Sequence, residues 1–318
     1  MHPKQRKHPS TPRPHHAVVR TALTIAILAL AAYVLRHNWH IVSQSLQAAR
    51  GASIPWLAVS VGFMAGTFMI AASIYGVLAL HTLHFPQTAL VEVSTAFVNR
   101  LLPSGIGGLG LHGLYLYRQK HTAAEATAVV SVNNLMGMVA HGFLLLVVAL
   151  FQADEFSQLA ARENDWFHPW QLAVLIGLVV GVALVSSVRH RLRSFAANLF
   201  QSVVRIRLAA LAGAFVLAVL LTITYTTILW CSARAVGIDL SLVQIFIVFS
   251  IGMLASTATP APGGLVGAEA GLFAGFVVYG IAAAPAGAAV LLYRLVTYWL
   301  PLVPGVLALS AARARKLV

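Results

Sequence analysis

Long continuous apolar runs, separated by short polar segments, dominate the sequence. An α-helix needs about 20 apolar residues to cross the hydrocarbon core of a bilayer. Apolar and polar residues do not alternate along the runs, which excludes a membrane β-barrel. The pattern therefore predicts an all-α polytopic integral membrane protein with about six transmembrane helices. The six runs are 18–36, 53–80, 122–152, 169–188, 208–233 and 285–309.

Two further apolar segments are interrupted by proline and glycine. The segment 87–117 contains PSGIGG at 103–108, and the segment 242–281 contains TPAPGGLVG at 259–267. The pieces on either side of each break are too short to span, so each segment is expected to form a re-entrant helical hairpin with its tip near mid-membrane. The expected tip residues are Pro103, Ser104, Gly105, Gly107, Gly108, Pro260, Pro262, Gly263, Gly264 and Gly267.

The distribution of Lys and Arg predicts the topology. With both termini in the cytoplasm and both hairpins re-entrant, the inside segments hold 14 basic residues and the outside segments hold 4. This bias follows the positive-inside rule and makes the two hairpins enter from opposite sides. The tip sequences at 103–108 and 262–267 share the pattern P-[SG]-G-[IL]-x-G and lie 159 residues apart, half of the 318-residue chain. We interpret this as an inverted repeat, the architecture of many secondary transporters; the alternative is a chance match between two Pro/Gly breaks.

Composition and charge narrow the class of protein. Only 9% of the residues are charged, 59% are hydrophobic and the mean hydropathy is +0.83, which excludes a soluble globular enzyme and a disordered protein. The net charge of +13 comes from short segments between apolar runs, so it indicates membrane orientation and not nucleic-acid binding. The single cysteine, Cys231, allows neither an intrachain disulfide nor a cysteine-based metal site.

Ionisable residues inside the apolar segments are the candidates for chemistry. Arg294 lies ten residues into the last run and Arg100 lies three residues before the first tip. A guanidinium at such a position can hold a phosphate in bidentate fashion; a structural ion pair of Arg100 with Glu92 or Glu125 is the alternative. Glu92 itself lies nearer the mouth of the first hairpin and is expected at the membrane interface. Glu269 follows the second tip by two residues. It could balance Arg294, bind a cationic head group, take up a proton or simply favour the start of a helix.

Neutral polar residues and helix ends complete the expected site. Tyr293 precedes Arg294, and Asn133 lies deep in the third run, where it can also bond across helices. The helix that follows each tip is expected to present free N–H groups that suit a lipid phosphate. No complete catalytic signature is present, so we expect no enzyme activity, no cofactor and no metal. Two alternatives remain open. One is an intramembrane lipid-modifying or hydrolytic enzyme that uses Ser104 with His112 or His141, and the other is a non-catalytic membrane partner of a glycosyltransferase or lipid synthase.

Two sequence blocks are similar to a known family. The residues VNRLLPSGIGG, followed by the span that contains Asn133, resemble the first block of the lysylphosphatidylglycerol synthetase transmembrane family, a flippase-like membrane domain. The stretch TPAPGGLVGAEAGL…LLYRLVTYWLPLVPG resembles its second block, P-x-P-G-G-x-G-x-x-E followed by Y-R-x-x-x-Y-x-x-P. The resemblance covers about 18–310. The residues on the second pattern are Pro260, Pro262, Gly263, Gly264, Glu269, Tyr293, Arg294, Tyr298, Pro301 and Gly305.

Departures from the family pattern qualify what the resemblance implies. Val266 stands where the family usually has glycine, Ala268 where a basic residue often precedes the glutamate, and Asn133 where a charged residue is common. The chain ends at Val318, without the soluble aminoacyl transferase domain of full-length synthetases. The resemblance therefore implies lipid translocation rather than aminoacylation. Relatives are linked to aminoacylated phospholipids, hopanoids and polyprenyl-linked sugars, so the resemblance does not imply one substrate.

The expected organisation is a basic cytoplasmic tail (1–17), a flippase-like membrane domain (18–310) with halves 18–152 and 169–310, and a second basic tail (311–318). The expected location is the bacterial inner membrane, with both termini cytoplasmic. The expected function is that of a lipid flippase or transporter that moves an anionic or zwitterionic lipid head group across this membrane. The head group is expected to sit in a polar mid-membrane cavity between the tips, held by Arg294 and Arg100. Membrane lipids are the expected partners, with a lipid synthase, a glycosyltransferase or a second copy of the chain left open, and no nucleic acid.

Overall fold

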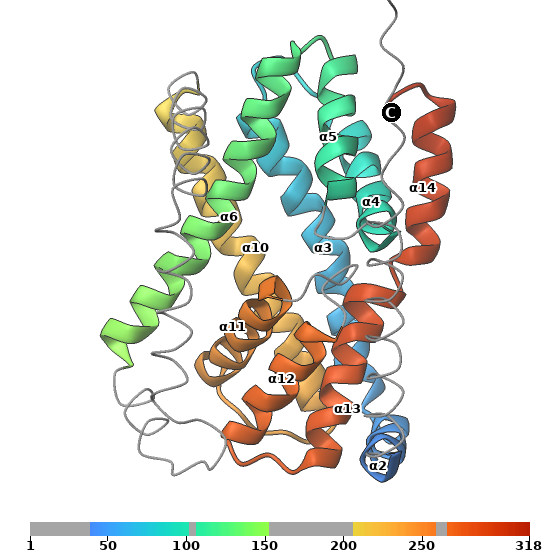
Figure 1. Ribbon diagram of the computed structural model, residues 1–318, viewed down its shortest axis with the longest axis vertical. Helices are drawn as coiled ribbons and strands as arrows, with labels where there is room; N and C mark the ends of the chain where they lie inside the picture. Colours follow the sequence, from blue (N-terminus) through green and yellow to red (C-terminus); the bar gives the residue numbers. More distant parts are fainter. Residues whose placement is uncertain (1–38, 102–105, 153–205, 259–265) are drawn as a thin grey trace, which may run out of the picture.

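The computed structural model describes residues 39–101, 106–152, 206–258 and 266–318 (Figure 1). These residues form helices joined by short turns, which confirms an all-α protein. The expected helices at 18–36 and 169–188 lie outside the described residues. Four helical stretches are long and apolar enough to cross a membrane, so the chain is a multi-pass membrane protein. They are α3 (Ile54–Leu78), α6 (Ala123–Phe151), α10 (Leu208–Ala235) and the composite stretch Ala283–Ala314.

The composite stretch is not one regular helix. It consists of α13 (Ala283–Arg294), the π-helical segment η1 (Leu295–Trp299) and α14 (Leu302–Ala314). Pro301 separates η1 from α14, because proline lacks the N–H that an α-helix needs. The apolar run at 285–309 predicted this span but not its interruption. The remaining helices are α2 (Trp39–Arg50), α4 (Phe85–Leu101), α5 (Ile106–Arg118), α11 (Leu242–Ala258) and α12 (Gly267–Val278).

The order of helices occurs twice along the chain. A long helix (α3 or α10) precedes a pair of shorter helices (α4 and α5, or α11 and α12), and a further long stretch follows. The first helix of each pair has 17 residues, and the second has 13 in α5 and 12 in α12. This order agrees with the division into two halves that the tip motifs suggest.

The two helix pairs lie at opposite ends of the Ala283–Ala314 stretch (Figure 1). The pair α4–α5 lies beside α14, and the pair α11–α12 lies beside α13. A contact at the outer end supports this placement, because Arg118 at the end of α5 donates to the carbonyl of Lys316 at 2.9 Å. Consequently the end of α4 and the start of α12 both reach the middle of the stretch.

Small residues allow close packing within and beside the pairs. A Cβ atom added to Gly271 would lie 2.7 Å from the Cβ of Ala255 and 2.9 Å from the Cα of Gly252, so α11 and α12 meet backbone to backbone. A Cβ added to Gly305 would lie 2.8 Å from the Cβ of Phe97, so α14 approaches α4 just as closely. These contacts hold α12 against α11 and α4 against α14.

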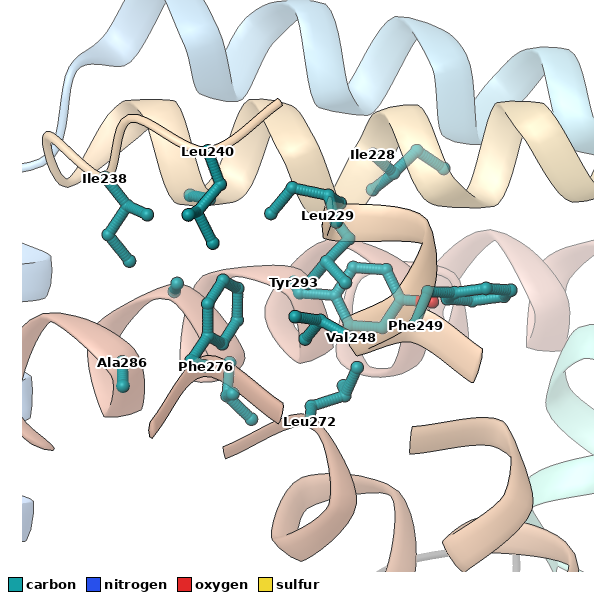
Figure 2. Packing of buried hydrophobic residues seen from close by; sticks show 14 of the residues in the cluster. Ile228, Leu229, Ile238, Leu240, Val248, Phe249, Leu272, Phe276, Ala286 and Tyr293 are labelled. Atoms are coloured by element: carbon teal, nitrogen blue, oxygen red, sulfur yellow. The ribbon is translucent and has the colours of Figure 1, made fainter. Parts of the chain in front are cut away.

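The largest buried cluster holds the second pair in place. It joins α10, α11, α12 and α13, with Leu229, Val248 and Phe276 at its centre (Figure 2). Leu229, Val248 and Phe276 are each fully buried. Tyr293 belongs to the same cluster, so the end of α13 is packed immediately before Arg294.

Both helix pairs end in the same kind of turn. The N–H of His121 donates to the carbonyl of Leu116 after α5, and the N–H of Ile281 donates to the carbonyl of Phe276 after α12, each at 3.1 Å. The residue before each donor has a positive φ, 68° and 79°, as this helix ending requires. The next long stretch therefore starts within a few residues and runs back alongside the pair.

We predict that His121 makes the stability of the protein depend on pH. Its Nε2 accepts the N–H groups of Leu80 and His81 at 3.2 and 3.3 Å, while Nδ1 lies 3.1 Å from the carbonyl of Leu116. Burial, and then the nearby His81, lower the pKa of His121 below its ordinary value. The unfolded chain therefore takes up the proton first. Stability should be complete above about pH 6.5 and fall as the pH drops below it.

The measurement is the melting temperature of the detergent-solubilised protein across this pH range. His121→Gln should flatten the dependence, because the replacement cannot titrate. The exposed His84 provides a matched control, and His84→Gln should keep the slope of the wild-type protein. An unchanged slope in His121→Gln would contradict the assignment.

Candidate functional site

Arg294 and Glu269 form an ion pair near the middle of the Ala283–Ala314 stretch. The Nε of Arg294 donates to Oε1 of Glu269 at 2.6 Å, and the two side chains are 13% and 32% exposed. Glu269 lies in the first turn of α12, where the helix dipole also favours a carboxylate. The geometry thus brings together two of the predicted site residues, with Glu269 placed to balance the arginine.

Arg100, in the last turn of α4, reaches the same region from the opposite pair of helices. Its Nη1 donates to the carbonyl of Ala96 and its Nη2 donates to the carbonyl of Thr297. The carbonyl of Thr297 needs such a donor, because Pro301, four residues later, has no N–H to offer. Arg100 therefore supplies the hydrogen-bond donor that Pro301 lacks.

Tyr298 joins the two arginines. The guanidinium carbon lies 5.0 Å from the centre of the Tyr298 ring for Arg100 and 4.8 Å for Arg294. Both distances are within the range of cation–π attraction. The ring itself is buried. Tyr298 is part of the family pattern in the sequence. Only the structure shows that its ring contacts both arginines.

The positive charge of Arg100 has no carboxylate partner in the described ranges. The alternative of an ion pair with Glu92 or Glu125 is wrong, because Glu92 contacts His112 and Glu125 closes a capping box with Thr122. The Nε of Arg100 is also buried without a hydrogen-bond acceptor. A guanidinium so placed favours an anion that would supply both the charge and the acceptor.

A buried acceptor without a donor lies on the other side of the ion pair. Oε2 of Glu269 is buried and has no hydrogen-bond partner, whereas its Oε1 is occupied by Arg294. In a low-dielectric site such a carboxylate oxygen favours a hydroxyl or an ammonium group. The cluster thus offers a donor on Arg100 and an acceptor on Glu269.

The start of α5 differs from the expectation of free N–H groups. Oδ1 of Asn99 accepts the N–H of Gly108 at 2.6 Å, so one of these donors is already used. A Cβ added to Gly108 would lie 2.6 Å from the amide of Asn99, which explains why glycine is needed there. Gly107 packs equally closely on Val98, and Gly267 is the first residue of α12. The other expected tip residues, namely Pro103, Ser104, Gly105, Pro260, Pro262, Gly263 and Gly264, lie outside the described residues.

Val266, the residue before α12, has a strained backbone. Its φ is 71° and its ψ is −51°, a conformation that a β-branched residue adopts only at a cost of about 1–3 kcal/mol. Its side chain is 56% exposed, so little packing offsets this cost. The position is also the one where valine replaces the usual glycine of the family pattern.

We predict that Val266→Gly stabilises the protein by about 1 kcal/mol, because the relief of strain exceeds the added entropy of glycine in the unfolded chain. The measurement is the melting temperature in detergent. The exposed Val303 of α14 has helical neighbours and serves as a matched control, since Val303→Gly should lower stability by about 1 kcal/mol. A loss of stability in Val266→Gly would show that the strain is absent.

A cavity of about 930 Å³ opens between α6, α10 and α11. Its wall is largely apolar, with polar groups from Asn133, His141, Tyr225 and Tyr293. Asn133 also donates to the hydroxyl of Tyr75 at 3.4 Å. The predicted site residues therefore fall into two neighbouring groups: Arg294, Arg100 and Glu269 at the ion pair, and Asn133 and Tyr293 at the cavity.

Glu92, which the sequence placed at the membrane interface, is buried in the protein between α4 and α5. It is 8% exposed, and its Oε1 lies 2.9 Å from Nε2 of His112. The Nδ1 of His112 lies 2.9 Å from the carbonyl of Gly108, so both ring nitrogens have partners. This arrangement leaves His112 no free nitrogen with which to activate Ser104.

Comparison with known families agrees with the two sequence blocks. The sequence model of the family described as lysylphosphatidylglycerol synthase TM region matches residues 18–305, nearly the whole chain. No curated protein sequence matches the chain.

Proposed function

Because the chain belongs to the lysylphosphatidylglycerol synthase transmembrane family, we propose that its lipid-related function is to move lipid head groups across the membrane. We place it in the bacterial inner membrane with both termini in the cytoplasm, on the basis of the Lys and Arg distribution. The lipid crosses without chemical change in this proposal.

The observation that carries the proposal is the unbalanced charge of Arg100 beside the Arg294–Glu269 pair. A phosphate there would accept from the Nε of Arg100. It would also supply the negative charge that no described carboxylate provides to Arg100. A hydroxyl or ammonium group of the same head group would donate to Oε2 of Glu269. We therefore propose a substrate whose head group carries a phosphate together with a hydrogen-bond donor.

The two helix pairs support a mechanism of alternating access. Each pair is proposed to enter the membrane as a re-entrant hairpin, and both meet the Arg294–Tyr298 segment midway along the last stretch. In an inverted repeat, rocking of one half against the other exposes such a site to each side in turn. The acyl chains would remain in the lipid and in the apolar cavity beside α6, α10 and α11.

The test is reconstitution of the purified chain in liposomes that contain phospholipid with a fluorescent head group. A membrane-impermeant reductant bleaches only the outer leaflet, so translocation raises the bleached fraction above one half. We expect this increase with the wild-type chain and not with empty liposomes. Head-group movement that survives the double variant Arg294→Ala plus Glu269→Ala would remove the proposed site.

A further inference from the structure

A second buried polar cluster lies within the α4–α5 pair, away from the arginines. Glu92 on α4 and His112 on α5 are 8% and 4% exposed, and Oε1 and Nε2 lie 2.9 Å apart. Nδ1 of His112 lies 2.9 Å from the carbonyl oxygen of Gly108. The head-group site uses neither residue.

The contacts of His112 determine how many protons the pair holds. A carbonyl oxygen can only accept, so Nδ1 must carry a hydrogen. Nε2 and the carboxylate oxygen would then both be acceptors, unless one further proton lies between them. A separation of 2.9 Å therefore requires one shared proton, either as imidazolium with carboxylate or as imidazole with carboxylic acid.

Among the described residues, His112 is the one side chain that bonds to Glu92. The helices that pack around α4 and α5 are α3, α6 and α14. The ring of Tyr75 on α3 stacks on His112, with centroids 4.2 Å apart and an interplanar angle of 4°. On α5 itself, Tyr115 bonds to Thr88. The other ionisable side chains of these helices are the exposed Tyr117 on α5, Glu125 and His141 on α6, the exposed Arg313 on α14, and Arg100 and Arg118 at the ends of α4 and α5. Tyr225 on α10 also interacts electrostatically with Glu92.

A line of contacts leads from this pair to the cavity. Tyr75 stacks on His112 and its hydroxyl accepts from Asn133, which lines the cavity wall. Loss of the shared proton would leave a carboxylate facing the lone pair of Nε2. This repulsion would break the one side-chain bond that His112 makes from α5 to α4 and would change the position of the ring on which Tyr75 stacks.

We propose that Glu92 and His112 form a proton-binding site, and that its uptake and release of one proton accompany each lipid head group that the protein moves. The proposal rests on the proposed function. The proton leaves to water from between Oε1 and Nε2, and what remains is a Glu92 carboxylate and a neutral His112. A translocator coupled in this way uses a proton gradient as its energy source.

The experiment measures lipid asymmetry at equilibrium in proteoliposomes with the labelled phospholipid. A pH difference of one unit is imposed, and equal potassium with valinomycin holds the membrane potential at zero. One proton per lipid should shift the ratio of labelled lipid between the leaflets by about tenfold. A trapped pH-sensitive dye should report proton movement when lipid asymmetry is imposed on the wild-type chain instead.

The decisive variant is Glu92→Gln. Glutamine mimics the protonated acid and can still donate to Nε2, so the pair should stay joined but cease to exchange its proton. We expect Glu92→Gln and His112→Gln to lose the gradient-driven asymmetry, and we expect His84→Gln, at an exposed site before α4, to keep it.

The outcomes separate the two proposals. Wild-type protein that equilibrates lipid but gives neither asymmetry nor a dye signal overturns the proton site and leaves the transport function intact. Asymmetry that persists in folded Glu92→Gln also overturns the site. If the wild-type chain moves no lipid at all, the proposed function itself fails. The dye measurement uses wild-type protein only, so it decides the matter even if a variant does not fold.

Discussion

Replacing Glu269 by alanine is expected to lower the free energy of unfolding by about 3 kcal/mol, because it leaves Arg294 charged and partly buried without its partner. The loss should be the largest of any single substitution at the site. Unfolding in mixed detergent or by steric trapping measures it. The partial exposure of the Glu269 side chain keeps the expected value at the lower end of the range for buried pairs.

A double-mutant cycle checks the cause. Glu269→Gln and Arg294→Gln should each destabilise the protein, and the double variant should recover part of the loss, because no unpaired charge remains. A coupling energy near zero would mean that the two side chains do not interact in the membrane.

Replacing Arg100 by glutamine is expected to slow translocation of a phosphate-bearing lipid by about 10- to 100-fold, the value of a charge-assisted hydrogen bond to the head group. Arg100→Lys should retain the charge, yet a single ammonium cannot serve the carbonyl of Thr297 and a phosphate in the same way. Its rate should therefore fall between those of the wild-type protein and Arg100→Gln. The liposome bleaching assay measures all three rates.

Arg234→Gln is the matched control for an arginine outside the site. Arg234 pairs with Asp239 at the end of α10 and stacks on Trp230. Its substitution should leave the translocation rate unchanged within about twofold, since a surface ion pair contributes little. A wild-type rate in Arg100→Gln would mean that the head group does not rest on this guanidinium.

The sequence predicted the helices that can be recognised from the length of an apolar run alone. α3, α6 and α10 follow from runs of about 20 or more apolar residues. The bounds of α4 and α5 lie within about three residues of the predicted pieces, because proline and glycine mark the break between them. Helix α2 was not predicted. It lies in the polar stretch between two runs and packs on α13, a contact that no local pattern reveals.

The sequence identified those residues of the candidate site that are conspicuous by their type alone. Arg294, Arg100 and Glu269 stood out because charges are rare in apolar segments, and the structure brings all three to one region. Asn99 and Tyr298 could not be found in this way. The amide of Asn99 acts on a residue of the neighbouring helix, and Tyr298 matters through two arginines from different helices, so both roles depend on packing.

Glu92 shows that the position of a residue along a helix does not reveal how deeply the residue is buried. Its place seven residues into α4 suggested the rim of the hairpin, yet α5 folds back and covers it with His112. The buried pair is visible only when the two helices are aligned in space.

The missing N–H of Pro301 makes the carbonyl of Thr297 depend on Arg100. A phosphate bound to the Nε of Arg100 would leave Nη2 on this carbonyl. The same guanidinium would then hold the head group and join α4 to η1, beside the proline that interrupts the last stretch. The joint between the two halves would thus be firmest when a lipid is bound and weakest when the site is empty.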